Sequence, residues 1–72
     1  MSESRVVGID VAQATLAVAV LPEARVWEVP YTTEGVEQLA DELRALAPTR
    51  IVLEGTGGLQ APAVAALAVA GL

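Results

Sequence analysis

The fold is decided by residues 5–21, R-V-V-G-I-D-V-A-Q-A-T-L-A-V-A-V-L. Residues 5–10 form a short apolar run rich in β-branched side chains, which predicts a strand buried on both faces. Gly8 inside this run indicates close packing of another element, or a bulge. Residues 15–21 predict a second strand. Because the link between the two runs is short, we expect them to pair as a hairpin.

The mixed pattern of residues 25–29, R-V-W-E-V, is typical of an edge strand that ends at Pro30. It follows the second strand after a turn that contains a proline. Val26 and Glu28 share one face of this predicted strand, because side chains alternate along a strand. Trp27 lies on the other face, and we expect it to cover the core rather than to stack on a base.

Apolar residues then recur at helical spacing, which predicts an amphipathic helix. The stripe consists of Val36, Leu39, Ala40, Leu43, Leu46 and Ala47. Thr32 or Thr33 can cap the start of this helix, and Pro48 ends it. Acidic residues occupy its other side, which we interpret as a solvated face and not as a metal site; they are Glu37, Asp41 and Glu42.

The last quarter of the sequence predicts a fourth strand and a second helix. Residues 50–53, R-I-V-L, form the strand, which Glu54 ends. The loop G-T-G-G over residues 55–58 leads into a helix over residues 59–70, and Gly71 is a suitable residue after its end. We interpret the loop as a tight turn with glycines at positive φ. The alternative is that the backbone N–H groups of this loop bind a phosphate.

This order of elements predicts an α/β fold. Three strands form an antiparallel meander, a helix crosses over, and the fourth strand returns parallel to the first and is followed by the second helix. The pattern stops where a further strand is expected. We therefore interpret residues 1–72 as a single incomplete domain.

Composition excludes several classes of site. The 72 residues are 54% hydrophobic and include no cysteine and no histidine, so disulfides, thiolate metal sites and His-ligated zinc are excluded. Nine acids against four scattered arginines give a net charge of −5, so this segment alone should bind nucleic acid weakly or not at all. The sequence shows no targeting signal and no membrane span, which predicts a cytoplasmic protein without membrane association.

Two carboxylates stand at the ends of apolar runs. Asp10 closes the first strand and Glu54 the fourth. If these strands are parallel neighbours, their C-terminal ends lie at the same edge of the sheet and the two carboxylates converge. Hard oxygen ligands suit Mg²⁺ or Mn²⁺, and the cation would offset the cost of removing the carboxylates from water. The alternative is that each acid is merely the first solvated residue of a turn.

Three blocks of sequence closely resemble the N-terminal domain of the DEDD transposases of insertion-sequence family one-ten. They are V-G-I-D-V-A-Q-A-T-L-A-V-A-V-L (residues 7–21), V-W-E-V-P-Y-T-T-E-G-V (residues 26–36) and I-V-L-E-G-T-G-G-L-Q-A-P-A-V-A-A-L-A-V-A-G-L (residues 51–72). The resemblance implies an RNase H-like, RuvC-like fold in which four acids, in the order Asp, Glu, Asp, Asp, bind divalent metal and serve catalysis. Asp10 matches the first acid and Glu54 the second. The third and fourth acids, and the C-terminal domain with a nucleophilic serine, are not among these 72 residues.

The same resemblance implies a function and partners. Family members are recombinases that cleave and transfer DNA strands in transposition, guided by a structured RNA and acting as oligomers. The sequence departs from the family at Gln13, where lysine is common, at Ala17, where aspartate is common, and at Leu59-Gln60, where Tyr-Glu is common. These departures leave the two matched acids, Asp10 and Glu54, in place. With two of four acids, the segment alone should bind metal weakly and show no measurable activity.

Two other readings remain open. The N-terminus of an actin-like ATPase or sugar kinase also begins with a strand, an aspartate and a hairpin, but it usually has glycine where this chain has Ala12. A truncated, non-enzymatic protein could instead pair with a partner through an exposed sheet edge.

Overall fold

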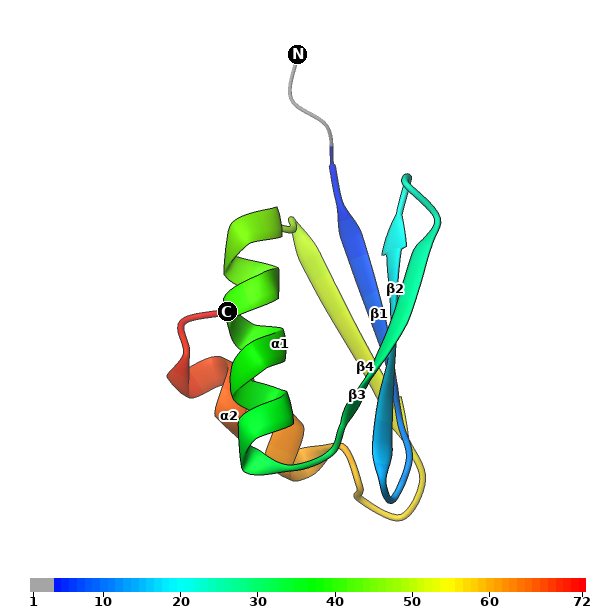
Figure 1. The fold of residues 1–72 in the computed structure, drawn as a ribbon, viewed down its shortest axis with the longest axis vertical. Helices are drawn as coiled ribbons and strands as arrows, with labels where there is room; N and C mark the ends of the chain where they lie inside the picture. Colours follow the sequence, from blue (N-terminus) through cyan, green and yellow to red (C-terminus); the bar gives the residue numbers. More distant parts are fainter. Residues whose placement is uncertain (1–3) are drawn as a thin grey trace.

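The computed structural model describes residues 4–72, which form a four-stranded sheet and two helices (Figure 1). Residues 1–3, which belong to the predicted domain and to the start that was interpreted as lacking a targeting signal, lie outside the described residues. In chain order the elements are β1 (Val6–Val11), β2 (Thr15–Leu21), β3 (Arg25–Pro30), α1 (Thr33–Leu46), β4 (Arg50–Gly55) and α2 (Ala61–Val69). This mixed α/β architecture confirms the predicted class and order.

The strands lie in the order β3-β2-β1-β4. β1 pairs with β2, and β2 with β3, in antiparallel register, whereas β4 pairs with β1 in parallel. The helix α1 makes the crossover that such a parallel return requires. The predicted meander, the parallel fourth strand and the edge position of β3 are therefore confirmed.

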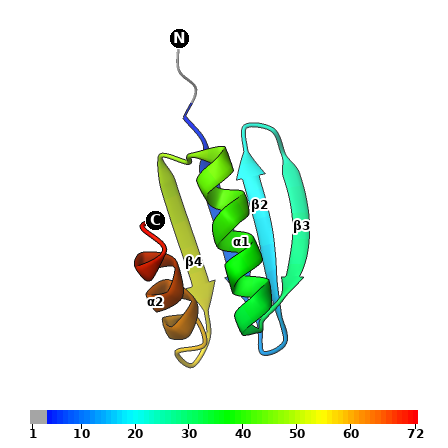
Figure 2. The ribbon, with the colours of Figure 1, turned by 60° about the vertical axis from the view of Figure 1, so that its left-hand side comes forward.

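Both helices lie on the same face of the sheet (Figures 1 and 2). The core forms between them and alternate residues of the strands; its fully or almost fully buried members include Val7, Ile9, Leu16, Val18, Val20, Leu39 and Leu43. The prediction that the first strand is buried on both faces is wrong, because no described element covers the sheet face opposite the helices. The apolar residues of β1 on that side are small or β-branched, and they do not belong to a second core layer.

Gly8 corrects a second expectation. A Cβ added at this position would meet nothing within 4 Å, and the pairing of β1 with β2 and β4 runs through Gly8 without interruption. Neither a closely packed element nor a bulge explains the glycine. Gly8 lies on the uncovered sheet face, which removes the packing reason for it.

The helix α1 follows the sequence prediction closely. Thr32 is the N-cap, and its hydroxyl accepts a hydrogen bond from the backbone N–H of Gly35 at 3.0 Å. The apolar stripe is buried from Val36 to Leu43, and Leu46 packs partly against the core. Ala47 departs from the predicted stripe: it is exposed because it is the C-cap, with a left-handed φ of 49°.

One tryptophan and one acid extend this packing. Trp27 is partly buried against the core, as expected, and its indole Nε1 donates to Glu42 on α1 at 3.2 Å. Glu42 is therefore half-buried, whereas Glu37 and Asp41 are exposed on the predicted solvated face.

The segment around α2 is fixed by a contact that the sequence did not predict. The hydroxyl of Tyr31 donates to the carbonyl of Leu59 at 2.6 Å and accepts from the N–H of Ala63 at 3.2 Å. The helix begins later than predicted, at Ala61, because residues 56–60 form turns. Gly57 and Gly58 have φ of 62° and 79°, so the interpretation of the loop as a tight glycine turn is confirmed.

Replacing Gly35 by alanine should destabilise the protein, although alanine favours helices. The added Cβ would overlap the backbone carbonyl oxygen of Pro30, which cannot rotate away as a side chain can. We expect the free energy of unfolding to fall by about 1–2 kcal/mol net of helix propensity. Gly8→Ala is the matched control, because its Cβ enters open space and should raise stability by about 0.5–1 kcal/mol. Urea unfolding followed by Trp27 fluorescence measures both, and equal signs for the two variants would contradict the packing argument.

Candidate metal centre on the open sheet face

The structure brings Asp10 and Glu54 together. They are register partners in the parallel pairing of β1 with β4. Partners on neighbouring strands point to the same face, with the strands about 4.8 Å apart. The predicted meeting of these two acids, which are far apart in sequence, is therefore confirmed. Both predicted strand ends are wrong by one or two residues: Asp10 lies inside β1 and Glu54 inside β4, because the pairing of the two strands continues to Val11 and Gly55.

Both acids lie on what we call the open face, the side of the sheet opposite α1 and α2. The residues on this face include Gly8, Asp10, Ala17, Ala19, Val26, Glu28, Arg50, Val52 and Glu54. Asp10 and Glu54 are both exposed. The premise that burial makes these carboxylates costly without a cation is therefore wrong within the described residues, and a metal role depends on their proximity instead.

The acids border a shallow hollow of about 260 Å³ on the open face. Gly8, Ala17 and Ala19 form its floor, and the larger side chains of Val26 and Val52 flank it. Small residues on three adjacent positions leave space above the sheet that longer side chains would fill. A cation held by the carboxylates would thus be accessible to water and to a ligand lying in the hollow.

Glu28 is a third acid in the same row, and the sequence prediction did not include it. Ala17 pairs with Asp10 on one side and with Glu28 on the other. Glu28 is therefore two strand spacings from Asp10, about 10 Å between backbones. The hairpin registers were needed to find it. Across residues 4–72, no three potential ligands are close enough to hold one metal ion, so the candidate centre consists of the Asp10–Glu54 pair.

The charge of this pair is not neutralised locally. The ion pairs within residues 4–72 join Arg5 to Glu23 and Arg44 to Asp41, at 3.2 Å and 2.6 Å. Two adjacent carboxylates without a cationic partner produce a negative potential that attracts a cation. Mg²⁺ is commonly bound by one or two carboxylates, with water and phosphate oxygens completing its shell. The site is therefore chemically suited to a divalent cation that also contacts a phosphate.

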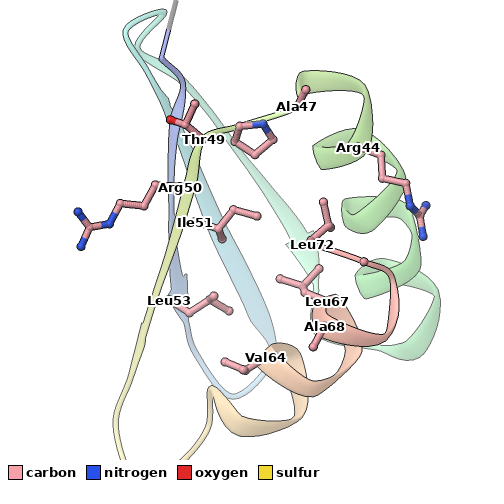
Figure 3. Close-up of a pocket in the computed structure, with 12 residues that line it drawn as sticks. Arg44, Ala47, Thr49, Arg50, Ile51, Leu53, Val64, Leu67, Ala68 and Leu72 are labelled. Atoms are coloured by element: carbon pink, nitrogen blue, oxygen red, sulfur yellow. The ribbon is translucent and has the colours of Figure 1, made fainter.

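An apolar groove lies elsewhere, on the other side of the sheet. It has a volume of about 710 Å³ and runs along the helix-covered side of β4, next to α2 (Figure 3). Apolar side chains point into it, among them Ile51, Leu53, Val64 and Leu67. Neither Asp10 nor Glu54 lines this groove, so the groove and the candidate metal centre have separate chemistry.

Fold and site together define a mixed α/β protein with a carboxylate pair on adjacent parallel strands. The chain matches no protein-family model, and no curated protein matches it. No helix within residues 4–72 has the length and apolar character needed to cross a bilayer.

Proposed function

We propose that this chain is the N-terminal part of an RNase H-like domain of a DEDD-type transposase of insertion-sequence family one-ten. In this proposal Asp10 and Glu54 are the first two metal-binding acids of the catalytic centre. The observation that carries it is the in-register parallel pairing that places these two carboxylates side by side. The sequence blocks quoted above supply the family, and the pairing supplies a reason why both acids are needed.

The roles of the residues follow from their chemistry. Asp10 and Glu54 would hold Mg²⁺ or Mn²⁺ through carboxylate oxygens, and the hollow beside them would admit a nucleic-acid phosphate. When bound, the cation supplies charge stabilisation at the attacking and leaving oxygens of strand transfer. Ala17 stands between Asp10 and Glu28, where family members often have aspartate, so this chain offers one carboxylate fewer beside Asp10.

Other parts of the activity would come from outside these 72 residues. The third and fourth acids, the serine nucleophile and a basic surface for DNA and guide RNA belong to the complete protein in this proposal. The complete protein would act as a homo-oligomer on DNA in the cytoplasm. The segment alone carries a net charge of −5 and would bind nucleic acid weakly or not at all.

Metal binding by the 72-residue chain tests the site directly. Mn²⁺ added to ¹⁵N-labelled protein should first broaden the amide signals around Asp10, Ala17 and Glu54, because paramagnetic relaxation falls steeply with distance. Asp10→Asn and Glu54→Gln should each weaken this effect at least tenfold, since each removes one of two charged ligands.

Glu37→Gln is the matched control, because Glu37 is exposed on α1, on the other side of the sheet. It should leave the broadening around Asp10 unchanged. Broadening that begins at the acids of α1, or that survives both Asp10→Asn and Glu54→Gln, would refute the proposed metal centre.

A further inference from the structure

Three connections meet at the end of the sheet where the candidate metal centre lies (Figures 1 and 2). The hairpin link of residues 12–14 follows β1, the loop of residues 56–60 follows β4, and Tyr31 stands between β3 and α1. Asp10 and Glu54 are each the penultimate residue of their strand. The positions of both acids therefore depend on how the two connections that follow them are held.

The loop of residues 56–60 has little of its own to fix it. Gly57 and Gly58 have positive φ, and glycine has more conformational freedom than any other residue. The helix α2 that follows has no side-chain cap at Gln60 and no acid in its first turn. Hydrogen bonds within the loop shape its turns but do not attach it to the sheet. Contacts with other parts of the chain therefore decide where the loop lies.

Tyr31 attaches the loop to the hairpin. Its ring is partly buried against the core. Its hydroxyl donates to the carbonyl of Leu59 at 2.6 Å and accepts from the N–H of Ala63 at 3.2 Å. Its backbone N–H donates to the carbonyl of Ala14 in the hairpin link at 2.9 Å. One residue thus joins the connection that follows β4 to the connection that follows β1.

The loop also packs on the last residue pair of the two parallel strands. Val11 and Gly55 form this pair, directly after the pair of acids. A Cβ added to Gly55 would lie 3.1 Å from Oε1 of Gln60 and 3.3 Å from Cβ of Val11. Because Gln60 contacts the end of β4 so closely, a movement of the loop is transmitted to the strand that carries Glu54.

We propose that Tyr31 is a positioning residue of the carboxylate pair. Its hydroxyl holds the loop of residues 56–60 against the ends of β1 and β4, and this fixes the separation of Asp10 and Glu54. The inference rests on the proposed function, because the separation of the acids matters through the cation that they would share. Hydrogen-bonded partners outside the ligands commonly change metal affinity by about ten- to a hundredfold. Tyr31 acts one step further away, through the backbone, so we expect a smaller effect.

Tyr31→Phe tests the role of the hydroxyl, because it keeps the packed ring. Half-maximal broadening of the Asp10 amide signal should require about three- to tenfold more Mn²⁺ than in the wild type. Thr32→Ala is the matched control, since it removes the hydroxyl of the next residue, whose hydrogen bond at 3.0 Å caps α1 instead. Both variants should lower the melting temperature by a similar amount, roughly 4–8 °C. Thr32→Ala should nevertheless leave the Mn²⁺ requirement within about twofold of the wild type.

A second measurement needs no metal. In the wild-type chain, the ¹⁵N order parameters of Gly57 and Gly58 should match those of β4, at about 0.85, because the loop is held. In Tyr31→Phe these values should fall below about 0.6, and the order parameter of Glu54 should fall measurably with them. In Thr32→Ala all three should stay at their wild-type values.

The outcomes separate the role of Tyr31 from the proposed function. A glycine loop that is already mobile in the wild type, or that stays ordered in Tyr31→Phe, would overturn this role whatever the metal does. A loop that loosens while the Mn²⁺ requirement stays unchanged, or an equal change in Thr32→Ala, would overturn it as well. A wild-type chain without broadening at Asp10 would refute the metal centre. The order parameter of Glu54 in Tyr31→Phe would then still decide whether Tyr31 positions this acid.

Discussion

Replacing Asp10 by asparagine is expected to reduce DNA strand transfer by the complete, proposed transposase roughly a thousandfold. The substitution keeps the shape of the side chain but removes one of the two charged ligands that β1 and β4 place side by side. Losing several kcal/mol of transition-state charge stabilisation corresponds to about three orders of magnitude in rate. The assay is strand transfer with Mg²⁺, DNA and guide RNA present.

Stability separates this effect from unfolding. Asp10 is exposed and makes no ion pair within residues 4–72, so Asp10→Asn should change the free energy of unfolding by less than about 0.5 kcal/mol. Glu28→Gln, in the same row of the open face but across Ala17, is the matched control and should retain most activity. Strand transfer by Asp10→Asn above a tenth of the wild-type rate would exclude the proposed catalytic role.

Leu43→Ala is expected to cause the largest loss of stability. Leu43 is 0% exposed, at the centre of the buried stripe by which α1 covers the sheet. Truncating a buried leucine removes transfer free energy and leaves a cavity, at a cost of roughly 2–5 kcal/mol. The total free energy of unfolding of a 72-residue domain is about 4–11 kcal/mol. The melting temperature should therefore fall by at least roughly 10 °C.

Leu21→Ala removes the same atoms from a side chain that is 56% exposed. We expect this control to cost less than about 0.5 kcal/mol. Thermal unfolding followed by circular dichroism compares the two variants. Similar melting temperatures for Leu43→Ala and Leu21→Ala would show that α1 does not provide the core packing described above.

Local sequence signals predicted most of the fold because they act over short distances. The short link after β1 predicted the hairpin, Thr32 was one of two predicted caps of α1, and the spacing from Val36 to Leu43 predicted its buried stripe. Each of these features depends on residues fewer than about ten positions apart. The boundary of α2 was less accurate, because Tyr31 fixes its start from another part of the chain.

The errors on the sheet have one physical cause. An apolar run of β-branched residues predicts a strand that is buried on both faces. In the structure β1 is buried on one face only, because α1 and α2 both lie on the same side of the sheet. The same arrangement exposes Asp10 and Glu54 and leaves space above Gly8. Which face a helix covers depends on the path of the chain between elements, and periodicity along one strand carries no such information.

The sequence by itself determined the order of the elements, the approximate extent of each strand and the two acids worth attention, since apolar periodicity, caps and turn residues are local properties. Only the tertiary structure decided that β4 lies beside β1 with Asp10 opposite Glu54, that Glu28 shares their row across Ala17, and that β4 has an open edge within the described residues. The pairing of β4 with β1 joins residues more than forty positions apart, so its register and the edges of the sheet exist only after the chain has folded.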